Sequence, residues 1–169
     1  MISNVVTAAA FAIALASFGL PAEAKDQKAF IREAIQGNLA EIEMGKLAQQ
    51  RSKNDGVKSF GRMLVDDHTA ANKRAQAVAQ QLNVSSPTRP SLKQRATYAA
   101  HSILRGATFD RRFVSHMISD HQKDIGAYRS QAQTGMQPTA GMAKETLPTL
   151  EKHLATAKSL QPNVTAQKR

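Results

Sequence analysis

Residues 57–72 read VKSFGRMLVDDHTAAN, and their apolar side chains recur every three or four positions. At about 100° per residue, Val57, Phe60, Leu64 and Ala71 share one face of a helix. His68 lies within that same face. The stretch therefore predicts an amphipathic helix that carries an imidazole on its buried side.

The composition extends this helical prediction to the whole chain. Its 169 residues are the size of one domain; good helix formers such as Ala, Gln, Lys, Arg and Leu are abundant, and aromatic residues make up only 5%. No cysteine is present, which excludes disulfides, zinc ribbons, iron–sulfur clusters and a thiol nucleophile. The sequence predicts an all-α domain in which histidines and carboxylates would have to hold any metal.

Turn signals divide the chain into four long helices and one short one. The expected long helices cover 26–51, 55–82, 108–135 and 138–160, and the short one covers 91–106. Asp26 and Thr108 are expected helix starts, and Ser91 with Gln94 fits a capping box. Pro148 should kink or restart the last helix. This pattern predicts an antiparallel four-helix bundle with a short extra helix between the second and third long helices.

The first residues predict export. The stretch from Val5 to Leu20 is almost wholly apolar, yet it is shorter than the roughly 20 residues of a membrane-spanning helix. Residues 22–24 read AEA, which fits a signal-peptidase site. The expected order is a cleaved signal peptide at 1–24, the bundle at 25–162 and a flexible basic tail at 163–169. An uncleaved anchor is the alternative for the first segment.

Positive charge is spread over all the expected helices. The chain has 23 Lys and Arg against 13 Asp and Glu, a net charge of +10. Cleavage would raise this to +11, because it removes Glu23 and no basic residue. RNA-binding signatures are absent and export separates the protein from nucleic acid, so we expect no nucleic-acid partner. We expect instead a periplasmic or outer-membrane-associated protein that adheres to the anionic envelope surface, with no membrane span in the mature chain. The oligomeric state stays open.

Every long helix places a potential metal ligand on or beside its apolar face. The five candidates are Glu41, His68, His121, Asp124 and His153. By contrast, Glu43, His101 and His116 fall outside these faces. Buried imidazoles and carboxylates must be satisfied by one another, by water or by a metal. Ligands from facing helices build the metal sites of bundles, so the five candidates predict such a site.

The prominence of imidazole predicts iron, zinc or manganese rather than calcium. Asp67, Asn72 and Asp120 are expected to orient the ligands through hydrogen bonds. For any one histidine, a hydrogen-bonded core position is the ordinary interpretation. The convergence of four helices is what favours a metal. A short internal echo, FGRMLVDDH at 60–68 and FVSHMISDH at 113–121, also links two of the helices.

Four stretches carry a family resemblance: LAEIEMGKLA, VKSFGRMLVDDHTAAN, FDRRFVSHMISDHQKD and TLPTLEKHL. In combination they resemble the signature blocks of the bacterial domain of unknown function 4142 family, over roughly residues 27–160. The resemblance implies export and a ferritin-like four-helix fold, with some members labelled outer membrane proteins, and it implies no known activity. The five candidate ligands match the recurring polar positions of the family. Val65 and Leu150 stand three residues before His68 and His153, where di-iron ferritins have glutamate, so we expect a mononuclear or differently ligated site.

Two functions are consistent with these patterns. The first is a metal-binding envelope protein with a role in stress defence or metal homeostasis. The second is a non-catalytic helical module with a polar core network and a basic surface that contacts the envelope. No phosphate-binding glycine loop and no serine-histidine-aspartate order stands out, so the sequence predicts no catalytic residues.

Overall fold

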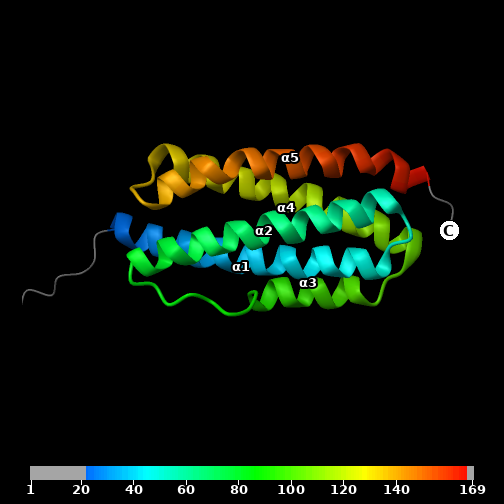
Figure 1. Cartoon of the computed structure of the whole chain (residues 1–169), viewed down its shortest axis with the longest axis horizontal. Helices are drawn as coiled ribbons and strands as arrows, with labels where there is room; N and C mark the ends of the chain where they lie inside the picture. Colours follow the sequence, from blue (N-terminus) through cyan, green and yellow to red (C-terminus); the bar gives the residue numbers. More distant parts are fainter. Residues whose placement is uncertain (1–21, 167–169) are drawn as a thin grey trace, which may run out of the picture.

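A computed structural model of the protein describes residues 22–166, with side chains from residue 26 onwards, and all its regular elements are α-helices. They are α1 (Ala22–Arg51), α2 (Asp55–Gln81), α3 (Leu92–Ser102), α4 (Gly106–Thr134) and α5 (Thr139–Ala166). The four long helices form the predicted antiparallel bundle, and the short helix α3 lies in the connection between α2 and α4 (Figure 1). None of the described helices is apolar over a stretch long enough to cross a bilayer.

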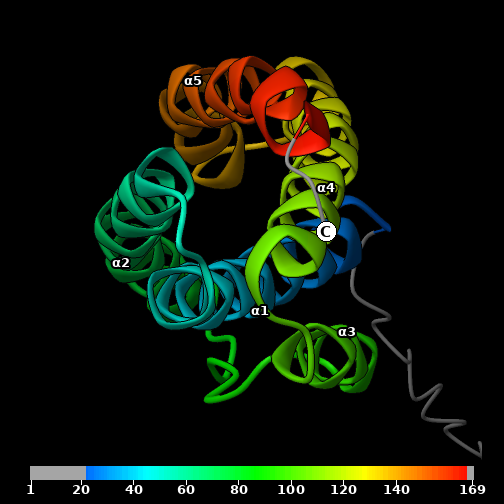
Figure 2. The same ribbon diagram turned by 90° about the vertical axis from the view of Figure 1, so that its right-hand side faces the viewer.

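Seen end-on, the long helices form a ring in the order α1, α2, α5, α4 (Figure 2). The closest pairs are α1 with α2 and α4 with α5. All ring neighbours run antiparallel, because α3 and the loop before it return the chain to the opposite end of the bundle before α4 begins (Figure 1). Helix α3 lies outside the ring against α1 and α4, so it covers one side of the bundle (Figure 2).

Capping residues and a left-handed asparagine fix several helix ends near the predicted positions. The side chain of Asn54 accepts a hydrogen bond of 3.1 Å from the backbone N–H of Val57 and caps α2. Ser91 and Gln94 form the expected capping box at the start of α3. Asn83 has φ 51°, a left-handed conformation that asparagine tolerates, and it follows the end of α2.

Two predicted helix starts were wrong. Helix α1 begins at Ala22 rather than at Asp26, and α4 begins at Gly106 rather than at Thr108. Gly106 has φ 53°, which favours glycine, and it separates α3 from α4 instead of ending the short helix. Residues 22–24 of the expected signal peptide form the first turn of α1, and residues 1–21 lie outside the described residues.

The last helix is longer than predicted. Helix α5 continues through Pro148 and Pro162 to Ala166, so Pro148 does not restart it. Part of the expected flexible tail is therefore helical, and Val164 packs into the core with 1% of its surface exposed. Burial of this side chain contributes to offsetting the backbone hydrogen bonds that the prolines remove. Residues 167–169 lie outside the described residues.

The interior consists of two apolar clusters separated by a polar layer. One cluster includes Ile35, Ile125 and Leu150, and the other includes Met44, Leu64 and Met117. Between them along the four helices lie the buried polar side chains Asn38, Glu41, His68, His121 and His153. The two segments of the internal echo lie side by side in this interior. The ring centroids of Phe60 and Phe113 are 6.0 Å apart, and those of His68 and His121 are 5.8 Å apart. The fold thus places the candidate ligands in one layer across the middle of the bundle.

Candidate metal centre

Three imidazoles converge in the polar layer. His68 of α2, His121 of α4 and His153 of α5 are all buried, and His153 has no exposed surface. One ring nitrogen from each lies within 4.8 Å of the other two. Among the described residues, no other group of three or more histidines or carboxylates converges in this way. The arrangement gives three nitrogen donors around one point, the number of protein ligands found in catalytic zinc sites.

Each imidazole is held by a hydrogen bond on its other ring nitrogen. His68 Nδ1 lies 2.9 Å from Asn38 Oδ1, and His121 Nδ1 lies 3.0 Å from the carbonyl oxygen of Met117. His153 Nε2 lies 2.9 Å from Asp67 Oδ2. All three partners are acceptors, so in each pair the imidazole N–H donates. A neutral imidazole has one N–H, and the remaining nitrogen of each ring therefore carries a lone pair.

The environment keeps these rings neutral. Burial lowers the pKa of His68 well below its usual value, and the neighbouring histidines lower it further. Burial and His153 lower the pKa of His121 to about 4. Burial also lowers the pKa of His153, although the hydrogen bond and charge of Asp67 act in the opposite direction. At neutral pH the layer therefore presents lone pairs rather than N–H groups toward its centre.

The spacing of two of these lone pairs is compatible with a cation bound between them. His121 Nε2 and His153 Nδ1 are 3.2 Å apart, and in the neutral rings neither carries a proton to bridge them. His68 Nε2 is buried and has no hydrogen-bond partner. Nitrogens bound to one tetrahedral zinc at 2.0–2.1 Å would be about 3.3 Å apart, close to the observed pair. A metal ion between the rings would satisfy all three nitrogens at once.

Asp67 is the residue outside the triad whose replacement tests this arrangement most simply. Although burial opposes it, the hydrogen bond with His153 and the charge of Lys152 hold the pKa of Asp67 below its usual value. We expect Asp67→Ala to weaken zinc binding roughly 10- to 100-fold, because His153 loses the acceptor that fixes its tautomer. Isothermal titration with zinc measures the effect, and Asp66→Ala, which changes the exposed neighbour, should leave the affinity unchanged. Equal affinities for the two variants would show that Asp67 does not orient the ligand.

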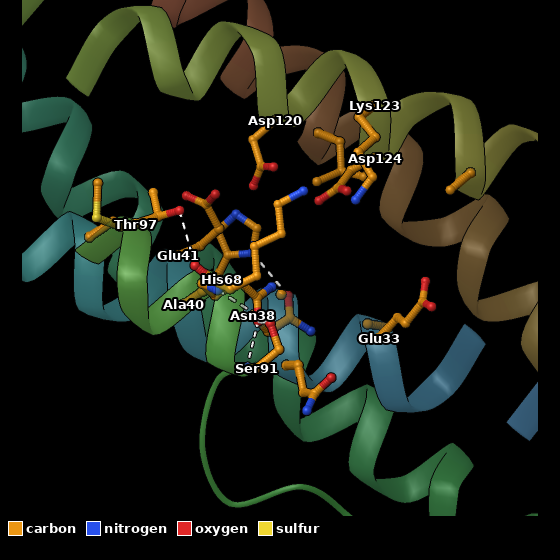
Figure 3. A pocket seen from close by; sticks show the side chains of 18 of the residues that line it. Glu33, Asn38, Ala40, Glu41, His68, Ser91, Thr97, Asp120, Lys123 and Asp124 are labelled. Atoms are coloured by element: carbon orange, nitrogen blue, oxygen red, sulfur yellow. Dashed lines mark hydrogen bonds between the residues drawn. The ribbon is translucent and has the colours of Figure 1, made fainter. Parts of the chain in front are cut away.

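The two predicted carboxylate ligands are placed beside the triad rather than in it. Glu41 and Asp124 line a cavity of about 560 Å³ between α1, α3 and α4, together with Asp120 (Figure 3). His68 is the one triad member that also lines this cavity. Burial, Asp120 and Asp124 raise the pKa of Glu41 well above its usual value, and burial with Asp120 raises that of Asp124 to about 7. The structure therefore brings three of the five candidates together, and the other two form a separate acidic group.

The residues predicted to lie off the apolar faces are outside the triad. His101 and His116 contact each other, with ring centroids 5.2 Å apart, where α3 packs on α4. His116 is only partly exposed, however, because His101 of α3 packs against it, and it lines the cavity. Of the three side chains expected to orient ligands, Asp67 contacts His153, Asp120 contacts Glu41, and Asn72 Oδ1 is buried without a partner.

Sequence reasoning missed Asn38, which positions His68. It lies on α1 three residues before Glu41 and therefore on nearly the same side of the helix. The same helical periodicity that placed Glu41 on the buried face could have placed Asn38 there. Its uncharged amide was not recognised as a hydrogen-bond partner for a histidine. The second missed partner, the carbonyl of Met117, belongs to the backbone of α4 and has no signature in the side-chain pattern.

The fold and the site together define a class of protein: an antiparallel four-helix bundle with a buried layer that contains three convergent imidazoles. The chain belongs to the family described as Domain of unknown function (DUF4142), whose model matches residues 14–160. This confirms the resemblance carried by the four sequence blocks. No curated protein and no solved structure matches the chain.

Proposed function

We propose that this protein binds one transition-metal ion through His68, His121 and His153. The observation that carries the proposal is the pair of facing lone pairs on His121 and His153, 3.2 Å apart in a buried layer. Asn38, Asp67 and the carbonyl of Met117 hold the rings so that their free nitrogens converge. A fourth position at the ion would be filled by water or by a small ligand, as in zinc sites with three protein ligands.

Three imidazole donors favour zinc most, ferrous iron next and manganese least. Three neutral imidazoles suit zinc and iron, whereas manganese prefers carboxylate and water oxygens. The carboxylates Glu41 and Asp124, which would have favoured manganese, lie outside the converging group. A role in metal homeostasis or in defence against metal-driven oxidation is the function that such a site supports, and its chemistry requires no catalytic side chain.

Zinc should raise the melting temperature of the purified protein. At a free zinc concentration 1,000-fold above Kd, the stabilisation is about 4 kcal/mol, or roughly 10 °C for a domain of this size. Because burial lowers the pKa of His121 to about 4, protons compete with the metal only near that pH. The shift should therefore persist as the pH falls from 7 to 5.5. Loss of the zinc shift at pH 5.5, where ordinary histidines are protonated, would contradict the buried neutral triad.

A non-catalytic module is the second candidate, and the same contact favours it. One proton shared between His121 Nε2 and His153 Nδ1 would also join the two rings at 3.2 Å. The polar layer would then be a hydrogen-bond network that specifies how the four helices pack. Imidazole resonances in an NMR titration distinguish the two: a protonated pair at pH 7 with no change on adding zinc supports the module.

We propose an exported, envelope-associated location on the sequence alone. The apolar stretch and AEA site at the N-terminus support export, and the net charge of +10 supports adhesion to anionic surfaces. Fractionation of cells that express the tagged chain tests the location. Release from membranes by high salt is the result expected of electrostatic adhesion.

A further inference from the structure

The acidic cavity beside the triad is lined by a buried carboxyl group that is not fully hydrogen-bonded. Glu41 has 2% of its surface exposed, and its Oε2 atom has no hydrogen-bond partner. Its other contacts include a hydrogen bond to Asp120, and Asp124 adds a third carboxyl group. Figure 3 shows Asp120 and Asp124 of α4 facing Glu41 of α1 across the cavity. Leaving such a group unsatisfied is unfavourable, and a cation in the cavity would offset that cost.

A second observation, independent of the carboxylates, connects this cavity to the metal centre. His68 lines the cavity and lies beside Glu41 (Figure 3), and its buried Nε2 atom has no partner. His121 and His153 do not line the cavity. The cavity therefore reaches the triad at one residue, and that residue carries a free lone pair.

The size and spacing of the cavity suit an ion that keeps its water. Six water molecules occupy about 180 Å³, so a hydrated divalent ion fits within about 560 Å³. The carboxylate oxygens do not converge closely enough to be grouped as ligands of a bare ion. An ion that contacts the carboxylates through its water is held weakly, so it can leave the cavity. The imidazoles of the triad would replace that water and bind the ion more tightly.

We propose that the cavity is the route by which a divalent metal ion reaches the histidine triad, with Glu41, Asp120 and Asp124 holding the hydrated ion on the way. This inference rests on the proposed function, since it requires the triad to be the destination. The carboxylates would also counter the general positive charge of the chain, +10, which otherwise repels cations. Where Glu41 or Asp124 carries a proton, the incoming ion displaces it to water.

The test is the rate at which the full-length protein takes up cobalt. Cobalt(II) bound by nitrogen ligands absorbs visible light, so stopped-flow absorption follows the filling of the triad directly. Glu41→Gln and Asp124→Asn change two carboxyl groups on different helices and keep the side-chain size. We expect each to lower both the association and the dissociation rate about 10-fold, with Kd changed less than about 3-fold, because a carboxamide cannot release a proton and become the negative charge that attracts the hydrated ion. Glu43→Gln, on α1 but outside the cavity, should change neither rate.

Each outcome has a distinct meaning. If the parent protein binds no cobalt, the proposed function fails. If the parent binds cobalt and both carboxamide variants do so at the parent rates, the route is wrong and the function stands. If the variants lose affinity through faster dissociation alone, the carboxylates are ligands of the bound ion, which also overturns the route. Melting curves verify that both variants fold, and a rate effect in either one suffices to support the route.

Discussion

Replacing His121 with alanine is expected to weaken zinc binding by about 1,000-fold. The reason is that one of three converging donors is lost, and a loss of about 4 kcal/mol corresponds to three decades in Kd. Structural zinc sites bind with apparent free energies of about 10–16 kcal/mol, so a loss of this size is a fraction of the total. Competition with a chromophoric zinc chelator measures both affinities.

The matched control is His116→Ala. It removes another imidazole, a half-buried one outside the triad, from the same helix, α4, and should leave zinc affinity within about 3-fold of the parent. His68→Ala, on α2, provides an independent loss of one ligand if His121→Ala does not fold. Parent-like affinity in both His121→Ala and His68→Ala would remove the triad as the binding site.

Replacing Gly45 with valine is expected to destabilise the fold by about 3 kcal/mol, which lowers the melting temperature by roughly 10 °C. Helices α1 and α2 lie close together where Gly45 faces Gly61. A Cβ atom on Gly45 would lie 2.6 Å from the carbonyl oxygen of Gly61, and one on Gly61 would lie 2.7 Å from that of Gly45. Both contacts involve backbone atoms, so the helices themselves must separate.

Zinc binding should weaken with the same substitution, because α1 carries Asn38 and α2 carries His68. Urea unfolding measures the stability change, and zinc titration measures the second effect. Gly126→Ala is the matched control, since nothing lies within 4 Å of a Cβ at this exposed helical glycine. It should be as stable as the parent or more stable by up to about 1 kcal/mol. A Gly45→Val protein with parent stability would contradict the close approach of α1 and α2.

Helical periodicity predicted the architecture and the buried histidines because both follow from local pattern. The spacing that selected His68 and His121 depends only on the turn of the helix, and both lie in the polar layer. Pro148 was expected to kink or restart the helix that carries His153. Because α5 continues through that proline, His153 points fully inward.

The contacts between helices could not be predicted from the sequence pattern, because they depend on tertiary packing. Glu41 was correctly predicted to be buried, yet periodicity carries no information about which neighbouring helix a side chain meets. In the structure Glu41 faces Asp120 of α4 and lies outside the triad. Likewise, the end of α5 depends on where Val164 packs, which no local signal encodes. The covering of His116 by α3 is a third consequence of contacts between distant segments.

The most direct test of the account is anomalous diffraction at the zinc absorption edge from a crystal of the protein grown with zinc. We expect one strong anomalous peak in the middle of the bundle, about 2.0–2.1 Å from one nitrogen each of His68, His121 and His153. The nitrogens hydrogen-bonded to Asn38, Met117 and Asp67 should stay in place. A peak held only by carboxylates, or no peak within bonding distance of the three imidazoles, would contradict the metal centre.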